Sequence, residues 1–466
     1  MAAAPPNSNP DKPTVVIAGA TGFIGRWFIE RYHDKYHIIA LSRSEMLTGP
    51  DYDRAEWRSV ELYSLTSTEA ALSGADYAIY LVHSMQPNTR LHQGSFEDTD
   101  LLLADNFGRA AKANGVKQII FMGGIIPEDE EVEDLSRHLR SRWETERTLG
   151  AAGVPVTALR AGIIVGSGGS SFQMIRKLVE RLPVLICPAW CDSPTQPVDL
   201  HDALLMIDYC LGREDTFNRH FDIGGPQPTT YAEMIRTVAD LMGKKRVVKS
   251  VKYFSPGFSK LWVALFTDNS QELVSPLVES LQHQMVAQDN ELLAAFPERS
   301  TFRNAARRAL YGKEQLPPLP ERRKKEETER NTVRSIQRLP NPQKHTATYV
   351  ARIYQRWLPI FFRTLINVNT DGDTSVFRVG GVPLLQLQFI PDRSDDDRQL
   401  FYVNGGKLVR RKDHGWLEFR RVLDDRYIIS AIHEFVPSLP WAVYVTTQAK
   451  AHAFVMDRFG KYLKGD

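Results

Sequence analysis

The sequence predicts an α/β fold with a doubly wound parallel sheet, followed by a separate α+β domain. Short apolar, β-branched runs alternate with helical patterns from residue 14 to about residue 310, and this alternation requires a parallel sheet with right-handed crossovers. From residue 332 onward, short runs of alternating polarity follow one another, and the chain ends in an amphipathic helical pattern. The length of 466 residues exceeds the size at which one hydrophobic core stops growing, so two domains are expected.

The chain is expected to divide into four segments. Residues 1–13 have neither a basic start nor an apolar centre, so they are interpreted as a disordered leader rather than a signal peptide. Residues 14–312 form the α/β domain, and residues 332–466 form the α+β domain. Residues 313–331 combine prolines with a run of charges, a composition typical of a linker or a solvated connecting helix.

Composition excludes several classes of protein. Hydrophobic residues make up 42% and charged residues 24%, which argues against a largely disordered chain. The net charge of +2 provides no electrostatic footprint for nucleic acid. The three cysteines, Cys187, Cys191 and Cys210, are too few for a disulfide framework, so a reducing, cytoplasmic location is expected. The pair Cys187 and Cys191 lacks the convergent partners of a metal site, and no metal is predicted.

Apolar segments are too short to predict a transmembrane helix. No run approaches the roughly 18 residues that a membrane-spanning helix requires. Two shorter clusters, LWVALF beginning at Leu261 and WLPIFF beginning at Trp357, could contact a membrane surface or a lipid. The alternative, which we favour, is that both clusters are buried in a hydrophobic core.

A glycine-rich loop follows the first predicted strand, residues 14–18, and leads directly into a helix. Gly19 permits a tight turn, Gly22 lets backbone N–H groups approach a diphosphate, and Gly25 allows the helix to pack closely on the strand. The N-terminus of the helix adds a partial positive charge. The residues expected to hold a dinucleotide here are Gly19, Thr21, Gly22, Phe23, Ile24 and Gly25. The alternative is an ordinary glycine-rich turn between a strand and a helix.

The end of the second predicted strand, residues 37–41, indicates which dinucleotide binds. A cofactor without a 2′-phosphate usually meets an acidic residue at this position, whereas a basic residue suits the phosphorylated form. The chain has Ser42 and Arg43 there, which favours NADP over NAD. The alternative is a solvated surface arginine, because Glu45 lies close by in the sequence.

The remaining strand ends should face the same cleft, because ligands bind beyond the carboxyl ends of parallel strands. The further predicted strands are residues 58–62, 77–82, 117–122, 156–160 and 221–223. The predicted helices are residues 68–73, 96–114, 135–149 and 231–242, the last with a capping box of Thr230 and Glu233. The additional residues expected to line the cofactor cleft are Leu62, Leu81, Val82, His83, Gly162 and Ile163.

Two motifs carry a family resemblance: GATGFIG at residues 19–25 and LRAGIIVGSG at residues 159–168. With them, the chain resembles the extended and atypical branch of the short-chain dehydrogenase/reductase superfamily over residues 14–310. It resembles more closely a bacterial-type group of NAD(P)-binding proteins with an uncharacterised C-terminal domain, through residues 80–85, 138–142 and 182–184. The resemblance implies a Rossmann fold, a nicotinamide cofactor and oxidoreductase chemistry.

The chain departs from the superfamily at the residues that would perform catalysis. The usual Tyr-x-x-x-Lys pair falls on His138 and Arg142, and the usual serine falls on Gly123-Gly124. Arg142 could bind the nicotinamide ribose but cannot act as an acid, whereas an imidazole such as His138 could donate the proton. His83 is a second candidate to face the nicotinamide. The alternatives are that His138 and Arg142 only line the cleft and that His83 is a structural residue at the strand end.

The C-terminal domain shows the element order strand, helix, several strands, long helix. The predicted strands are residues 333–339, 375–379, 384–389, 400–403, 416–422 and 427–435, and the predicted helices are residues 347–365 and 441–463. This order is similar to the helix-grip fold of Bet v 1 and START-like lipid-binding domains, a likeness at the level of fold alone. Its aromatic and aliphatic side chains could line a lipid cavity or fill a core: Phe377, Leu385, Phe389, Phe401, Trp416, Phe419, Phe454 and Phe459.

The expected function is that of an NADP-dependent oxidoreductase whose C-terminal domain shelters a hydrophobic carbonyl or enone substrate. The alternative is a non-catalytic NADP(H)-binding sensor or scaffold with a lipid-binding C-terminal domain, and lipid transfer by that domain is a third possibility. The absence of the superfamily's serine and tyrosine favours the alternative, whereas His138 favours catalysis. The substrate and the oligomeric state are not predicted.

Overall fold

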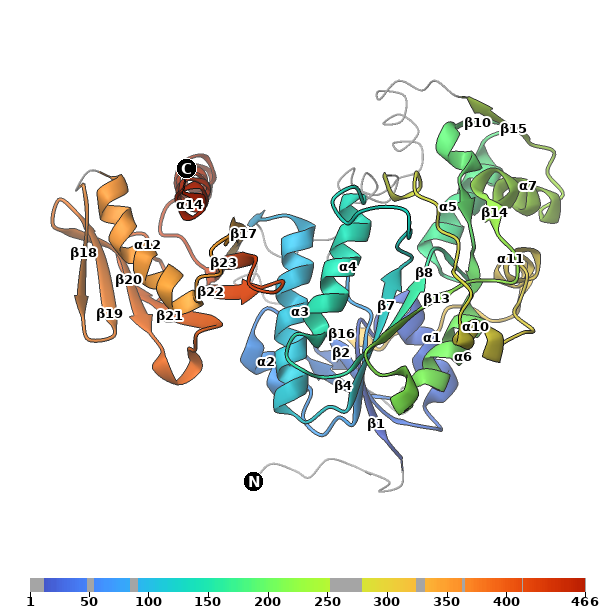
Figure 1. The fold of residues 1–466 in the computed structure, drawn as a ribbon, viewed down its shortest axis with the longest axis horizontal. Coiled ribbons are helices and arrows are strands. Elements are labelled where there is room, and N and C mark those ends of the chain that lie inside the picture. Colours follow the sequence, from blue (N-terminus) through green and yellow to red (C-terminus); the bar gives the residue numbers. More distant parts are fainter. Residues whose placement is uncertain are drawn as a thin grey trace. The chain divides into compact units, whose positions relative to one another are not determined.

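The computed structural model of the chain describes residues 12–47, 54–83, 91–251, 279–323, 332–362, 365–412 and 414–465. Most of the predicted leader, the apolar cluster at residue 261 and the second half of the predicted linker lie outside the described residues. The chain forms two compact units, Met1–Met85 with Asn106–Arg323 and Gln86–Asp105 with Lys324–Asp466 (Figure 1). The second unit therefore takes in residues 86–105, which the sequence analysis placed in the α/β domain.

A seven-stranded parallel sheet forms the centre of the first unit, in the order β4-β2-β1-β5-β7-β8-β13. The strands are β1 (Thr14–Ala18), β2 (His37–Ser42), β4 (Glu56–Ser59), β5 (Tyr77–Tyr80), β7 (Gln118–Gly124), β8 (Val156–Ala161) and β13 (Arg219–Ile223). Most of their residues are buried, as expected for strands covered on both faces. The predicted parallel α/β sheet is confirmed.

Helices cover both faces of this sheet (Figure 1). They are α1 (Phe23–Tyr32), α2 (Leu65–Ala71), α3 (Phe96–Ala113), α4 (Arg137–Gly150) and α6 (Leu200–Cys210). Apolar side chains of α1 and α6 share one core with the strands beneath them. On α3, a Cβ at Gly108 would meet the Leu149 carbonyl oxygen at 2.6 Å, so glycine is what lets α3 and α4 pack this closely.

Further elements of the first unit surround a second, smaller core. They are α5 (Ser170–Arg181), β10 (Val184–Pro188), α7 (Tyr231–Leu241), β15 (Val247–Val251) and α11 (Phe302–Tyr311). Short elements connect them: β9 (Ile164–Val165), β11 (Pro194–Thr195), β12 (Val198–Asp199), β14 (Thr229–Thr230) and α10 (Glu291–Ala295). The predicted capping box at the start of α7 is confirmed, because Thr230 and Glu233 each accept a backbone hydrogen bond from the other.

The first part of the predicted linker belongs to the first unit. Residues 321–322 form β16 (Glu321–Arg322), which pairs antiparallel with β3 (Met46–Leu47). Just before it, the Arg26 guanidinium donates to the Pro317 carbonyl oxygen. We call residues 312–323 the strap, because they cross α1 and then join β3.

An eight-stranded sheet forms the second unit, in the order β18-β19-β20-β21-β22-β23-β17-β6. The strands are β6 (Leu91–Gln93), β17 (Val333–Pro340), β18 (Ile366–Asp371), β19 (Thr374–Val379), β20 (Val382–Phe389), β21 (Arg398–Gly405), β22 (Trp416–Val422) and β23 (Tyr427–Phe435). All neighbours are antiparallel except β6, which runs parallel to β17. The strands β6 and β18 were not predicted from the sequence.

Two helical regions cover one face of this sheet: α12 (Ala347–Phe361) and the C-terminal pair α13 (Trp441–Thr446) and α14 (Gln448–Lys464). The helical geometry is interrupted at Thr447, so the structure has two helices where the sequence predicted a single one. Aromatic rings of α12 and α14 pack on the sheet, with Tyr354 5.5 Å from Phe419 and 5.0 Å from Phe459 between ring centroids. Among the described helices, none has the length and apolarity needed to cross a membrane.

The predicted cavity-lining residues do not share one environment. Phe377, Phe401, Phe419 and Phe459 are buried in the core beneath the helices, with Leu385 and Phe389 at its margin, and Phe454 is half exposed. Trp416 was placed wrongly, because its ring stacks on His433 at 4.8 Å, and His433 belongs to a group of buried charges on the other face of the sheet. Successive side chains of a strand point to opposite faces of the sheet. Because Leu417 and Phe419 of β22 face the core, Trp416 lies on the opposite face.

Candidate functional site

The glycine loop has the geometry that diphosphate binding requires. Gly19 adopts a positive φ of 87°, and a Cβ there would meet Leu81 at 3.0 Å. A Cβ at Gly25 would meet the Ala20 Cα and the Gly19 carbonyl oxygen at 2.7 Å, so only glycine lets α1 start this close to the loop. Gly22 is the N-cap of α1 and offers no side chain to cap it, which leaves the N-terminal N–H groups of the helix to bind an anion.

The other predicted loop residues surround this turn. Thr21, Phe23 and Ile24 are half-buried. The Phe23 ring lies against two glycines of the LRAGIIVGSG region, because a Cβ at Gly166 or Gly169 would meet it at 3.0 to 3.2 Å. The structure therefore brings the two motifs that carried the family resemblance into contact.

At the end of β2, Arg43 is exposed and Ser42 is buried. The Ser42 hydroxyl accepts a hydrogen bond from the Ser44 N–H at 3.2 Å, which shapes the turn. Glu45 forms an ion pair with Arg323 of the strap at 3.0 Å. The acidic residue that complicated the interpretation of Arg43 therefore has another partner.

Of the predicted strand-end residues Leu81 and Leu62, the first lies where expected and the second does not. The Leu81 N–H donates to the Ala18 carbonyl oxygen at 2.9 Å, so residue 81 continues the pairing of β5 with β1 past their last paired residues. Leu62 was predicted to end a strand, but β4 stops at Ser59. Leu62 instead lies in the turn before α2, where its carbonyl oxygen accepts from Asn106 at 2.8 Å. The Ser64 cap of α2 requires this turn and so shortens the strand.

His83 and His138 come together although they are 55 positions apart in the sequence. His83 follows the end of β5, and His138 lies in the first turn of α4. Their ring centroids are 4.9 Å apart with an interplanar angle of 61°, and both side chains are half-buried. Imidazole can both donate and accept a proton near neutral pH, so either ring is a candidate for acid–base chemistry.

The Arg142 side chain forms hydrogen bonds with the backbone at the ends of two strands. Its guanidinium donates to the Val82 carbonyl oxygen at 3.1 Å and to the Met122 carbonyl oxygen at 2.5 Å, and it lies over the Phe121 ring. These bonds join the ends of β5 and β7. Arg142 is buried, so its observed role is to fix the strand ends beside His83.

The position expected to align with the superfamily's serine is closely packed. A Cβ at Gly124 would meet the end of the Leu139 side chain at 3.0 Å, so a larger residue requires that side chain to shift. Next to it, Gly123 lies under Arg160, which forms a two-point ion pair with Glu146 at 2.7 and 2.9 Å. The site therefore offers imidazoles in place of hydroxyl groups.

Residues after β8 are covered by a segment that the sequence analysis did not connect with the site. Gly162 and Ile163 were predicted to contact the cofactor, and Ile163 is buried in the second core. A Cβ at Gly162 would lie 3.4 Å from Met285 and from Thr195. Backbone hydrogen bonds of Met285 to Pro194 and Gln196 hold this segment in place.

His283 is a site residue that sequence reasoning missed. Its Nε2 accepts a hydrogen bond from the Ser136 N–H at 3.1 Å, and its Nδ1 lies 2.6 Å from Glu130. Ser136 in turn caps α4 by accepting from the Leu139 N–H. His283 thus fixes the turn that carries His138, and only three-dimensional proximity could reveal it.

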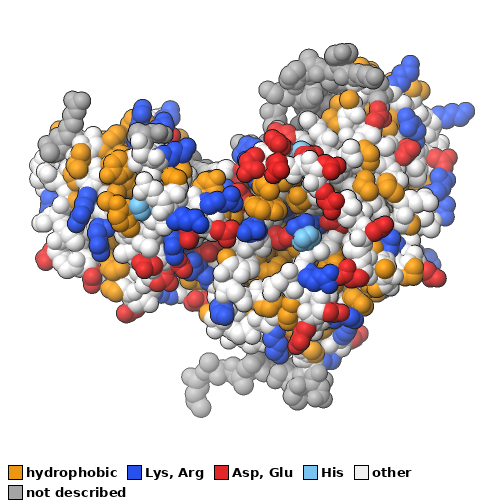
Figure 2. Space-filling view, in the orientation of Figure 1, with side chains coloured by type: hydrophobic (Ala, Val, Ile, Leu, Met, Phe, Trp, Pro, Cys, Tyr) orange, Lys and Arg blue, Asp and Glu red, His pale blue; other side chains and the backbone are white. Residues whose placement is uncertain are grey.

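An acidic surface lies beside this turn. Acidic side chains gather near the start of α4 on the face shown in Figure 2, and residues 128–134 include six of them. All but Glu130 are exposed to solvent. The loop therefore gives the surface beside the start of α4 a concentration of negative charge.

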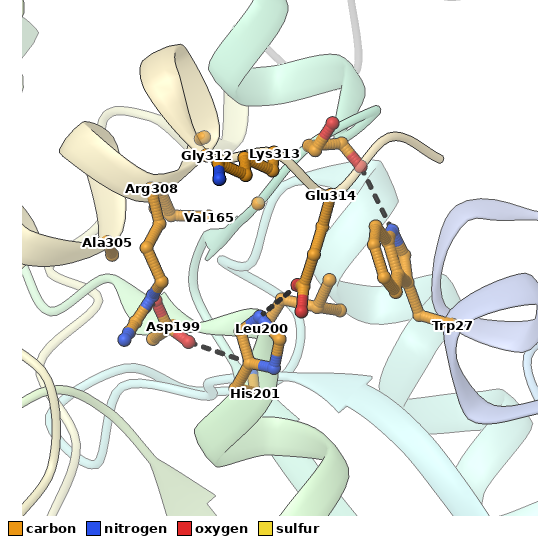
Figure 3. Close-up of a pocket in the computed structure, with 13 residues that line it drawn as sticks. Trp27, Val165, Asp199, Leu200, His201, Ala305, Arg308, Gly312, Lys313 and Glu314 are labelled. Carbon is orange, nitrogen blue, oxygen red and sulfur yellow. Dashed lines mark hydrogen bonds and ion pairs between the residues drawn. The ribbon is translucent and has the colours of Figure 1, made fainter. Parts of the chain in front are cut away.

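A pocket of about 440 Å³ opens elsewhere in the first unit, between α1, α6, α11 and the strap (Figure 3). In it, Arg308 pairs with the buried Asp199 at 2.7 Å, and Glu314 reaches His201 at 3.2 Å. Four of its charged or titratable side chains are thus joined in two pairs, and none of the predicted site residues lines it. Gly312, Lys313 and Glu314, at the start of the strap, form one wall of this pocket.

Comparison with known protein families agrees with a dinucleotide site at the glycine loop. Residues 19–178 match the model of a family described as NAD(P)H-binding. The first unit contains an NAD(P)-binding domain of Rossmann type. The auxiliary protein GraX of Staphylococcus aureus (strain NCTC 8325 / PS 47) is 30% identical over 127 residues, which are 27% of this chain and 41% of that protein. The chain thus matches about two fifths of the length of this curated relative.

Several solved enzymes are similar to part of the chain. A nucleoside-diphosphate-sugar epimerase from Staphylococcus aureus is 16% identical with a TM-score of 0.48, over 63% of this chain and 99% of that one. Citrobacter sp. triphenylmethane reductase complexed with NADP(H) is 18% identical with a TM-score of 0.48, over 63% and 99%. An NADPH-dependent quinone oxidoreductase from Escherichia coli is 16% identical with a TM-score of 0.45, over 63% and 98%. These similarities assign no substrate to this chain.

Proposed function

We propose that the chain is an NADP(H)-dependent oxidoreductase of atypical short-chain type that reduces a hydrophobic carbonyl or enone. The observation that carries the proposal is the contact of His83 with His138, with ring centroids 4.9 Å apart. Both residues follow the carboxyl edge of the parallel sheet, where a nicotinamide lies in folds of this type. The glycine loop at Gly19, Gly22 and Gly25 supports the cofactor part of the proposal.

Each residue would have one task in this reaction. NADPH, held at the glycine loop by Gly19, Gly22 and Gly25, would supply a hydride to the electrophilic carbon of the substrate. His138 donates a proton to the substrate oxygen, and His83 contacts His138 and replaces that proton. Arg142 positions both strand ends through the Val82 and Met122 carbonyl oxygens and takes no part in proton transfer.

The competing function is that of a sensor or scaffold that binds NADP(H) without turnover. Its support is the absence of the hydroxyl groups that the superfamily uses, because Gly123 and Gly124 stand at the position of the serine and His138 at that of the tyrosine. In either case we propose a reducing, cytoplasmic environment, which suits three buried, free thiols.

For the second unit we propose a helix-grip domain that binds a hydrophobic molecule or lipid. The support is the order of the strands, in which β17, the first strand after residue 332, pairs with the last strand β23, and a long helix follows β23. The close packing of Tyr354, Phe419 and Phe459 limits the space beneath the helices. A ligand would therefore enter at the margin, near Leu385 and Phe389.

The test is NADPH oxidation with a panel of lipophilic quinones, enones and aldehydes, using purified full-length protein and the variant His138→Ala. The variant should lose roughly 100-fold or more in kcat, the usual contribution of a general acid, while the Kd for NADPH changes little. His83→Ala should also lower kcat, but less.

A matched control is His220→Ala, because His220 is exposed on β13. It should keep the full rate. If His138→Ala retains the wild-type rate, the catalytic role of His138 is wrong. If no substrate in the panel is reduced while NADPH binds tightly, the sensor function takes its place.

A further inference from the structure

The strap is held against the first unit at several points along its length. Near its start, Glu314 pairs with His201 at 3.2 Å (Figure 3). Farther on, the Leu316 side chain fills the space above Gly168, where a Cβ would meet it at 2.7 Å. The pairing of β16 with β3 holds its end. The path of the strap therefore leads to the loop that follows the second strand.

The last residues of the strap are placed by specific bonds to that loop. Arg322 pairs with Met46 in the β3–β16 ladder. The Arg323 N–H donates to the Glu45 carbonyl oxygen at 3.0 Å, and its guanidinium pairs with the Glu45 carboxylate, also at 3.0 Å. Arg43 lies only two residues before Glu45. The end of the strap thus brings two arginines to the loop that follows β2, and Arg43 belongs to the same loop.

The charges of this cluster do not cancel. Arg43, Arg322 and Arg323 are all exposed, and the acidic residues beside them are Glu45, which pairs with Arg323, and the exposed Glu321, so three cations lie near two carboxylates. An exposed ion pair such as Arg323 with Glu45 contributes little stability and exchanges readily. A phosphate monoester carries between one and two negative charges near neutral pH and pairs with guanidinium groups through two hydrogen bonds.

We propose that the strap completes a binding site for the 2′-phosphate of NADP(H), with Arg43, Arg322 and Arg323 as its cations. The site lies where an arginine accommodates this phosphate in dinucleotide-binding folds, about 20 residues after the glycine loop. Glu45 positions Arg323 when no phosphate is present. This inference rests on the proposed function, because it needs NADP(H) to bind at the glycine loop.

The test compares the double variant Arg322→Ala/Arg323→Ala with wild-type full-length protein by calorimetric titration with NADPH and NADH. The Kd for NADPH should rise about 10- to 100-fold, the value of one or two charge-assisted hydrogen bonds. The Kd for NADH should change less than about twofold, because NADH lacks the phosphate. Titration with 2′,5′-ADP and 5′-AMP should repeat the difference without the nicotinamide.

The control is Arg307→Ala, which removes an exposed arginine from α11 and should leave both affinities unchanged. Unchanged NADPH affinity in the double variant, or an equal loss for NADPH and NADH, would overturn the role of the strap. Failure of wild-type protein to bind either coenzyme would instead overturn the proposed function. Retained NADH binding also shows that the double variant is folded.

Discussion

At the scale of single residues, the close approach of backbone segments shapes the proposed dinucleotide site more than side-chain chemistry does. Gly25 shows this best, because a Cβ there would lie 2.7 Å from two backbone atoms of the loop. Backbone cannot move aside as the end of a flexible side chain can, so a larger residue must displace α1 from the loop. The anion site at the start of α1 depends on that placement.

We therefore expect Gly25→Ala to weaken NADPH binding by roughly tenfold or more, the equivalent of a 1–3 kcal/mol overpacking cost. The measurement is the Kd by titration at a temperature where the variant remains folded. Gly150→Ala is the matched control: at the end of α4 a Cβ would meet Val156 at an ordinary 3.4 Å. Equal affinities for wild type and Gly25→Ala would contradict this account of the loop.

Among single residues, the sequence predicted features that depend on neighbouring positions in the chain. It did not predict contacts between residues that are far apart in the chain. The glycine motif and the β1 boundaries were predictable, because spacing and β-branched character are visible in the sequence. The contact of His83 with His138 was not predicted, although both were candidates. Arg142 could not be assigned to carbonyl oxygens at residues 82 and 122 without knowing that two strand ends meet.

At the scale of elements, β22 carries an unusual pattern of buried charge. Glu418 is fully buried, and it accepts hydrogen bonds from Arg398 at 2.8 Å and Arg420 at 2.7 Å and contacts His433 at 3.0 Å. Burial alone would raise the pKa of Glu418, but the two arginines hold it well below its usual value. Burial also lowers the pKa of His433.

Removing the Glu418 charge should therefore strongly destabilise the second unit. Glu418→Gln leaves two buried arginines without their shared carboxylate, an effect of about 3–5 kcal/mol. Differential scanning calorimetry should show an earlier transition. Asp457→Asn, which breaks the exposed pair with Lys461 on α14, should cost no more than about 0.5 kcal/mol. Similar shifts for the two variants would show that the buried network is not stabilising.

Contacts on the same face of the sheet explain why the place of residues 91–105 in the second unit was not predicted. The strand at residues 91–93 was not predicted, and residues 96–105 were assigned to a helix of the α/β domain, a helix that the structure confirms. Their partners lie more than two hundred positions away: Asp98 pairs with Arg338 at 2.6 Å, and Asp105 pairs with Arg420 at 2.5 Å. Ion pairs at such separation leave no periodic signal in a single sequence.

At the scale of the whole molecule, the second unit is not a contiguous C-terminal domain. Residues 86–105 contribute β6, which pairs with β17, and the aspartates that face Arg338 and Arg420. The predicted boundary at residue 332 followed a change in composition, which marks where the chain leaves the first unit. Composition cannot show that an earlier segment has already entered the second.

A fragment of residues 332–466 should consequently fail to fold, although it contains every element that the sequence predicted for the domain. It lacks Asp105, so the fully buried Arg420 loses one of its two carboxylate partners, and β17 loses its neighbour β6. Unpaired buried charge costs several kcal/mol, comparable with the whole stability of a small domain. The matched comparison is a fusion of residues 86–105 to residues 332–466 through a long glycine–serine linker, which should show cooperative thermal unfolding by circular dichroism. If the shorter fragment unfolds just as cooperatively and at the same temperature, residues 86–105 are an accessory to the second unit, and its core is complete without them.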